Sequence, residues 1–174
     1  MAAGKGRLDI IRFLLEYGTD KLLAEGTNGT DALVCACEKS HPEVVKYFME
    51  KGFDVRSVSS EGRTPLHAAA EGERPDIVEL LVHHGAVLDA TDQAGNTPLH
   101  VAASIGSVHT ALWLRRRGSD LTARNHCQQT PHMIAKSSLE RRQSKSTERL
   151  VEILDWNVPL PGADADDRQE CVTM

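Results

Sequence analysis

Apolar side chains along this chain fall into short stripes with helical spacing. Residues 77–81 read Ile-Val-Glu-Leu-Leu, and residues 10–14 read Ile-Ile-Arg-Phe-Leu. A glycine follows each stripe, at Gly85 and at Gly18. Apolar residues separated by three or four positions lie on one face of a helix, and glycine is the usual residue just past a helix end. The pattern therefore predicts short amphipathic helices, each closed by a glycine.

An internal repeat with a step of 33 residues organises these stripes. Residues 64–67 read Thr-Pro-Leu-His, the same four residues stand at 97–100, and a further Thr-Pro begins at residue 130. Glycines keep the same step in two series, Gly29, Gly62 and Gly95 in one and Gly52, Gly85 and Gly118 in the other. Self-similarity at a period of about 20–50 residues is typical of stacked repeat proteins.

The Thr-Pro step predicts where the first helix of each repeat begins. A threonine hydroxyl can cap a helix, and proline at the first helical position loses no hydrogen bond. The alanines at residues 68–70 and 102–103 are small enough for neighbouring helices to approach closely. One pair of helices cannot bury both of its faces, so we expect neighbouring pairs to stack into a continuous core.

With this repeat the chain resembles the ankyrin-repeat family, whose pattern joins Asp-x-x-Gly-x-Thr-Pro-Leu-His to an alanine-rich helix and an Ile-Val-x-Leu-Leu helix. Residues 92–120 follow the pattern closely, and the resemblance covers about residues 2–156. It implies an all-α solenoid of about five helix-turn-helix repeats with short β-hairpin loops. The expected repeats are residues 1–25, 26–58, 59–91, 92–124 and 125–156.

The two ends of the array depart from the pattern. Met1 falls inside the expected first helix, which predicts a truncated first repeat; a short gene product, an alternative start or a fragment of a longer array would each account for it. His132 and Met133 replace Leu-His in the last copy, which predicts a degenerate C-terminal cap. The polar stretch 137–147 predicts a connection between the last two helices, and residues 157–174 predict a disordered acidic tail.

Composition and charge narrow the classes of function. The chain carries 20 Lys and Arg against 25 Asp and Glu, a formal charge of -5, which is the wrong sign for a nucleic-acid binder. No apolar run approaches the roughly 20 residues that span a bilayer, and no signal peptide is evident, so we expect a cytoplasmic or nuclear protein. The cysteines have no zinc or CxxC spacing and are expected to be reduced, with Cys35 and Cys37 as small buried residues.

The histidines, which could suggest catalysis or metal binding, have structural explanations. His67 and His100 occupy the fixed histidine of Thr-Pro-Leu-His, where the family resemblance implies that the imidazole organises the turn. His83 and His84 are adjacent on a predicted helix, so they point apart and make poor joint ligands. No Ser/His/Asp arrangement, phosphate-binding loop or HExxH motif is present. We expect no enzyme activity, no cofactor and no metal.

Two basic clusters and one tryptophan also have structural explanations that do not require a binding site. The clusters are Arg115, Arg116 and Arg117 in one, and Arg141, Arg142, Lys145 and Arg149 in the other. They are expected at opposite ends of a helix pair, which favours solvated charge over one merged anion surface. Trp113 stands where Leu80 stands in the previous copy, which favours filling of the core.

The resemblance implies that a protein partner binds along hairpin tips and the exposed face of the first helices, at positions that differ between copies. Carried onto this sequence, the candidate binding residues are Asn28, Glu38, Lys39, Glu61, Arg63, Glu71, Gln93, Asn96, Ser104, Ile105, His126 and Gln129. This set is polar with one apolar member, which predicts a specific protein interface and not a small-molecule pocket. A monomeric, non-catalytic adaptor or regulator is the leading hypothesis.

The last four residues support an alternative function. Cys171-Val172-Thr173-Met174 resembles a C-a-a-X prenylation box, in which terminal Met specifies farnesylation. Farnesylated Cys171 would make the chain a membrane-tethered adaptor with weak membrane association. Against this, Thr173 is not aliphatic and the preceding residues are acidic, so a free cysteine and a weak PDZ ligand remain alternatives.

Overall fold

A computed structural model describes residues 5–6, 28–142 and 145–155. The helices of this part are α3 (Asn28–Glu38), α4 (Pro42–Glu50), α5 (Pro65–Glu71), α6 (Pro75–His83), α7 (Pro98–Ile105), α8 (Val108–Arg116), α9 (Pro131–Arg142) and α10 (Lys145–Leu154). The expected first repeat, apart from residues 5–6, and the expected acidic tail lie outside the described residues.

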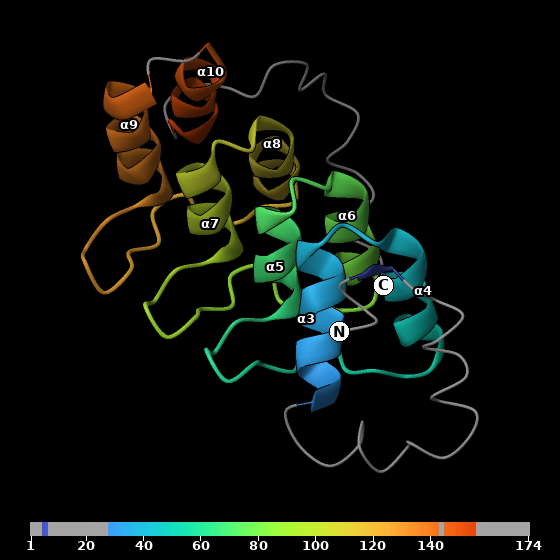
Figure 1. Ribbon diagram of the computed structural model, residues 1–174. Coiled ribbons are helices and arrows are strands. Elements are labelled where there is room, and N and C mark those ends of the chain that lie inside the picture. Colours follow the sequence, from blue (N-terminus) through green and yellow to red (C-terminus); the bar gives the residue numbers. More distant parts are fainter. Residues whose placement is uncertain (1–4, 7–27, 143–144, 156–174) are drawn as a thin grey trace, which may run out of the picture.

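The eight helices form adjacent pairs that stack in two layers. Figure 1 shows α3, α5, α7 and α9, the first helices of the pairs, side by side in one layer, with α4, α6, α8 and α10 in the other. Each first helix contacts its own second helix and the first helix of the neighbouring pair. The arrangement confirms the predicted all-α stack.

The second helices end at the glycines that the sequence indicates. Gly52, Gly85 and Gly118 have φ values of 81°, 89° and 90°, in the left-handed region that only glycine adopts readily. After each glycine, the amide of the next residue donates to a carbonyl in the last turn of the helix and so ends it. The Ala86 amide, for example, donates to the Leu81 carbonyl over 3.0 Å. The loop after each glycine then turns toward the next first helix, and the described loops contain hairpin hydrogen bonds but no assigned strand.

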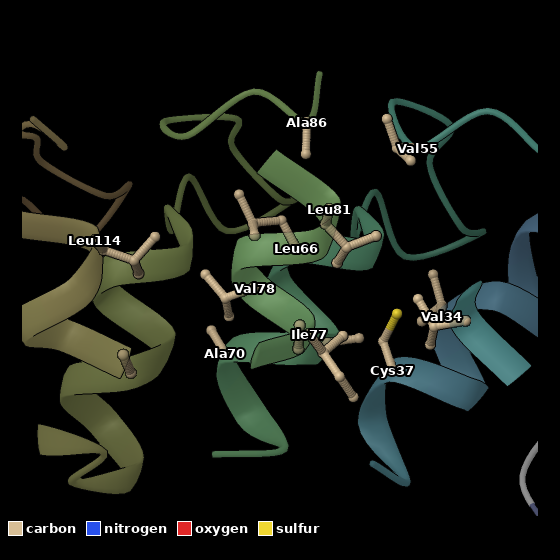
Figure 2. Close-up of a cluster of buried hydrophobic side chains, with 14 of the residues drawn as sticks. Val34, Cys37, Val55, Leu66, Ala70, Ile77, Val78, Leu81, Ala86 and Leu114 are labelled. Carbon is tan, nitrogen blue, oxygen red and sulfur yellow. The ribbon is translucent and has the colours of Figure 1, made fainter. Parts of the chain in front are cut away.

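The core lies between the helix pairs and is built from alanine and branched apolar side chains. Leu66, Leu81 and Leu114 are fully buried, and Figure 2 shows them in one cluster with Ile77 and Val78. Small alanines on the first helices bring the backbones together, and the larger side chains of the second helices fill the space between layers.

The two cysteines of α3 differ in exposure. Cys37 is fully buried, as predicted, and burial raises the pKa of its thiol far above the usual range. Cys35 is only half-buried, so the prediction of a buried residue is wrong in part. The equivalent residues one and two repeats later are Ala68 and Val101. Ala68 is small enough to be fully covered, whereas the larger Val101 is half-buried like Cys35, so the size of the side chain accounts for the difference in exposure.

The last helix pair corrects the expected connection over residues 137–147. Most of this stretch is helical, since α9 continues to Arg142 and α10 starts at Lys145. Ala135 and Ser138 are buried three positions apart, so α9 keeps one covered face despite its polar composition. Ser137 also satisfies its own hydroxyl within the helix by donating to the Ile134 carbonyl over 2.9 Å.

No helix among the described residues is long and apolar enough to cross a membrane.

Candidate functional site

The first helices of two central repeats begin in the same way. At α5 the His67 amide donates to Thr64 Oγ1 over 3.4 Å, and the Thr64 amide donates to His67 Nδ1 over 3.2 Å. At α7 the Thr97 amide donates to His100 Nδ1 over 3.1 Å. Each histidine therefore closes a reciprocal capping box, which confirms the capping role of the threonines and the structural role of these histidines.

The other ring nitrogen of each histidine fixes the hairpin of the following repeat. His67 Nε2 donates to the Asn96 carbonyl over 2.8 Å, and His100 Nε2 donates to the Gln129 carbonyl over 3.0 Å. Because Nδ1 accepts and Nε2 donates, the rings are neutral in this network. Burial is the main cause that lowers the pKa of both imidazoles, which agrees with the neutral form.

Side chains also link successive hairpin tips. Gln93 Nε2 donates to the Ser60 carbonyl over 3.0 Å, one repeat earlier. Asn125 Nδ2 donates to Asn96 Oδ1 over 2.9 Å, and the His126 amide donates to the Ala94 carbonyl over 2.9 Å. The tips therefore form one continuous edge beside the first helices.

Close contact between tips requires glycine at two positions. Gly62 and Gly95 have positive φ values of 70° and 76°. A β-carbon on Gly95 would lie 2.8 Å from His126 Cδ2, and one on Gly62 would lie 3.0 Å from Gln93 Cγ. Gln128 occupies the equivalent position of the last hairpin with φ 59°, an uncommon conformation for a residue other than glycine.

The first-helix part of the predicted binding surface contains paired charges. Arg63 on one tip forms an ion pair with Glu71 at the end of α5, and Lys39 Nζ lies 2.6 Å from Glu38 Oε1 at the end of α3. Ser104 is exposed and donates to the Val101 carbonyl over 2.9 Å, and Ile105 is half-buried beside it. This surface therefore carries charge of both signs toward α3 and is nearly neutral at α7.

Most of the predicted binding residues on the hairpin tips are exposed, but one of them is engaged in hydrogen bonds between hairpins. Glu61, Gln93 and His126 are exposed, as is Gln129. Asn96 is half-buried, and its Nδ2 donates to Asp92 Oδ2 over 3.2 Å while its Oδ1 accepts from Asn125. Asn96 thus shapes the edge by holding two hairpins together.

Of the remaining predicted residues, Asn28 is the first residue of α3, and Cys171 lies outside the described residues. The helix ends and tips bring the others to one side of the stack, the first-helix layer and its hairpin edge (Figure 1). Whether they bind a partner stays a prediction. We call the twelve candidate residues of the sequence analysis the binding strip.

A shallow depression on this side includes residues that the prediction omitted. It has a volume of about 170 Å³ and is lined by Val34, Cys35, Glu38, Ser59, Ser60, Glu61 and Arg63. Val34 occupies the position of the buried histidines, and Cys35 the position of Ala68. In the sequence, a side chain larger than alanine at the position of Ala68 could have indicated that Cys35 is partly exposed.

The basic residues of α8 lie in the other layer. Arg115 Nη1 donates to the Ile153 carbonyl of α10, and Arg117 Cζ lies 5.0 Å from the centroid of the Trp113 ring. Trp113 is half-buried and packs against the core, as predicted. Among the described residues, Arg142 and Lys145 stand at the other end of the last helix pair, which agrees with the expected separation of the clusters.

The remaining histidines of the prediction serve the end of α6. His84 Nδ1 lies 2.8 Å from the Leu80 carbonyl, and His83 Nε2 lies 3.6 Å from Glu79 Oε1. A donor at the last carbonyls of a helix stabilises its end. Within the part of the chain that the structure describes, no three His, Cys, Asp or Glu side chains are grouped as metal ligands would be.

Comparison with known proteins gives one match at the level of families. The family model described as ankyrin repeats, in three copies, matches residues 1–92 and residues 56–125. A search of curated proteins found no match.

Proposed function

The chain belongs to the ankyrin-repeat family, whose repeats are generally protein-protein interaction modules, and we propose that it is a non-catalytic adaptor or regulator that binds a protein partner along the binding strip. The observation that carries the proposal is the continuous edge formed by the hairpin tips. His67 and His100 each hold the hairpin of the next repeat, so the exposed tip residues are presented in a fixed register. Preorganised contact residues reduce the entropy cost of binding.

The character of the strip favours a polar protein surface as the partner. Its exposed members are amide, hydroxyl, imidazole and charged side chains. The depression beside α3 is too small and shallow to enclose a drug-sized ligand. Function in this fold is carried by such variable side chains, since the capping boxes and alanines serve the framework.

The test is proximity labelling in cells with the full chain and two charge variants. In the strip variant, Glu71, Ser104 and Ile105 are changed to Arg, which adds positive charge along the first-helix layer. In the control variant, Glu43, His109 and Glu152, all exposed on the second helices, are changed to Arg. We expect the strip variant to lose the proteins that the wild type labels, and the control variant to keep them, with helicity unchanged in both.

Labelling that survives in the strip variant would place the interface elsewhere. Loss of labelling in both variants would mean that binding depends on the total charge of the chain and not on the strip.

The membrane-tethered alternative depends on Cys171, outside the described residues, and stays a prediction from the sequence. Intact mass measured in eukaryotic cells decides it. Farnesylation would add the isoprenoid and remove residues 172–174, and Cys171→Ser would abolish both changes. An unmodified mass in cells that farnesylate a control protein would leave the untethered adaptor.

A further inference from the structure

We propose that the acidic segment 163–170 of this chain binds the basic end of α8, formed by Arg115, Arg116 and Arg117. This goes beyond the proposed function, because the basic end lies in the second-helix layer and the binding strip does not include it.

The basic end of α8 concentrates three guanidinium groups in a protein whose formal charge is -5. Arg116 and Arg117 are exposed. Arg117 pairs with Glu79, whose Oε1 lies 3.9 Å from Arg117 Nη2 and also faces His83. That distance is long for a charge-assisted hydrogen bond, so Glu79 compensates the charge of Arg117 only in part.

The end of α10 lies against this basic end. Arg115 Nη1 donates to the carbonyl of Ile153, in the last turn of α10. Burial lowers the pKa of Arg115, and the nearby negative charge of Asp155 opposes that shift. The chain therefore leaves α10 beside Arg115, the first of the three arginines.

The segment that follows has the charge and the reach to occupy this surface. Residues 163–170 contain Asp164, Asp166, Asp167 and Glu170 with a single Arg168. Asp164 follows Asp155 by nine positions, and nine residues can span up to about 30 Å. A tether of this length gives an effective concentration on the order of millimolar, which is enough to populate weak ionic contacts.

Arginine is well suited to hold such a segment. Its guanidinium binds carboxylates through two parallel hydrogen bonds. The half-buried ring of Trp113 lies beside Arg117 and adds an aromatic face to the surface. Occupation of this surface would keep the acidic segment on the second-helix layer and away from a partner on the first-helix layer.

The experiment uses the full chain with a nitroxide on Cys171, which directly follows the acidic segment. Cys35→Ala and Cys127→Ser remove the other accessible thiols, and Cys37 is fully buried. We expect strong broadening of the amide NMR signals of residues 113–117 at low salt and sharp signals from the hairpin tips 59–63 and 92–96. Broadening should disappear in 1 M salt, where the screening length is about 3 Å.

Charge variants identify the partners. Asp164→Lys with Asp166→Lys and Asp167→Lys should abolish the broadening, as should Arg116→Glu with Arg117→Glu, and the two sets combined should restore it. Lys46→Glu with Lys136→Glu, at exposed sites elsewhere, should leave it unchanged. Absence of broadening at residues 113–117, or broadening that persists in high salt and in both sets of variants, overturns the proposal. The segment variant leaves the helices untouched, so a folding defect in α8 could not produce its result.

Discussion

His67 Nε2 donates a hydrogen bond to the main-chain carbonyl of Asn96, 29 residues further along the chain, over 2.8 Å. The same ring accepts a bond from the Thr64 amide, so one side chain caps its own helix and positions the hairpin of the next repeat. The next repeat repeats the arrangement with His100 and Gln129.

His67→Ala should destabilise the protein by about 2–4 kcal/mol, because it opens a fully buried site and leaves the Thr64 amide and Asn96 carbonyl without a partner. Urea unfolding followed by circular dichroism measures the loss. Met133→Ala is the matched control, since Met133 holds the equivalent position in the last repeat and is 48 % exposed. The control should cost less than about 1 kcal/mol. Equal losses in the two variants would contradict the structural role of His67.

Stability should fall as the pH is lowered from 7 to 5. The pKa of His67 and that of His100 are lowered in the folded state by burial, whereas the unfolded chain has the ordinary value of about 6.5. Below that value the unfolded state binds more protons, so the free energy of unfolding decreases, by up to about 1.4 kcal/mol per pH unit for each histidine. Urea midpoints at several pH values measure the slope, and His67→Gln should make it shallower. A flat profile in the wild type would mean that the rings are not held neutral.

The carboxyl groups with lowered pKa do not contribute to the loss of stability between pH 7 and pH 5. They include those of Asp76, Asp92 and Asp120. Their contributions are present above the ordinary value of 3.8 and are lost only as the pH falls below it. The raised pKa of Asp89, caused chiefly by burial, has the opposite sign and would reduce the fall.

Gly72→Ala should destabilise the protein even though Gly72 has ordinary helical backbone angles, with φ at -70°. At such a position alanine usually adds about 0.4–1 kcal/mol of stability. Here the new β-carbon would lie 2.9 Å from the Cys37 carbonyl oxygen and 2.9 Å from Ser40 Oγ, in the neighbouring repeat. We expect a net loss of about 1–3 kcal/mol from overpacking, measured by thermal or urea unfolding. A stabilised variant would show that the first helices are less closely apposed.

Gln128→Gly should stabilise the protein slightly, by up to about 1 kcal/mol, because it relieves a left-handed conformation at φ 59°. The reverse change in the previous hairpin, Gly95→Ala, adds strain at φ 76° and a contact of 2.8 Å with His126. Gly52→Ala separates these effects, since its φ is 81° and nothing lies within 4 Å of the new β-carbon. Gly95→Ala should cost more than Gly52→Ala, and the order of the three unfolding midpoints checks the prediction.

The fold was predictable from the sequence wherever the step of 33 residues is intact. Thr64 and Thr97 indicated the helix starts, and Gly85 and Gly118 the helix ends, because each residue type satisfies one local backbone requirement. The long α9 was not predicted, since Ser137 and Ser138 are weak helix formers and only the neighbouring α7 and α10 decide their burial.

The sequence predicted the residues of the binding strip less well than it predicted the fold. Variation between copies identifies positions that the framework does not require, but it does not show which side chains the neighbouring repeat engages. Asn96 is such a case, because its amide is bonded to Asp92 and Asn125 of the hairpin edge. Cys35 is the converse, a residue at a framework position that lines the depression.

The bond from His67 to Asn96 also sets how this protein can be divided. The hairpins around Asn96 and Gln129 are each held by the histidine of the repeat before them. If one such 33-residue copy were transplanted into another array, the shape of its hairpin would depend on the neighbouring repeat in that array. The natural unit of exchange therefore joins the first helix of one repeat, from Thr64, to the tip of the next, through Asn96. A segment transplanted from Thr64 through Asn96 should therefore keep the shape of its hairpin tip in the new array.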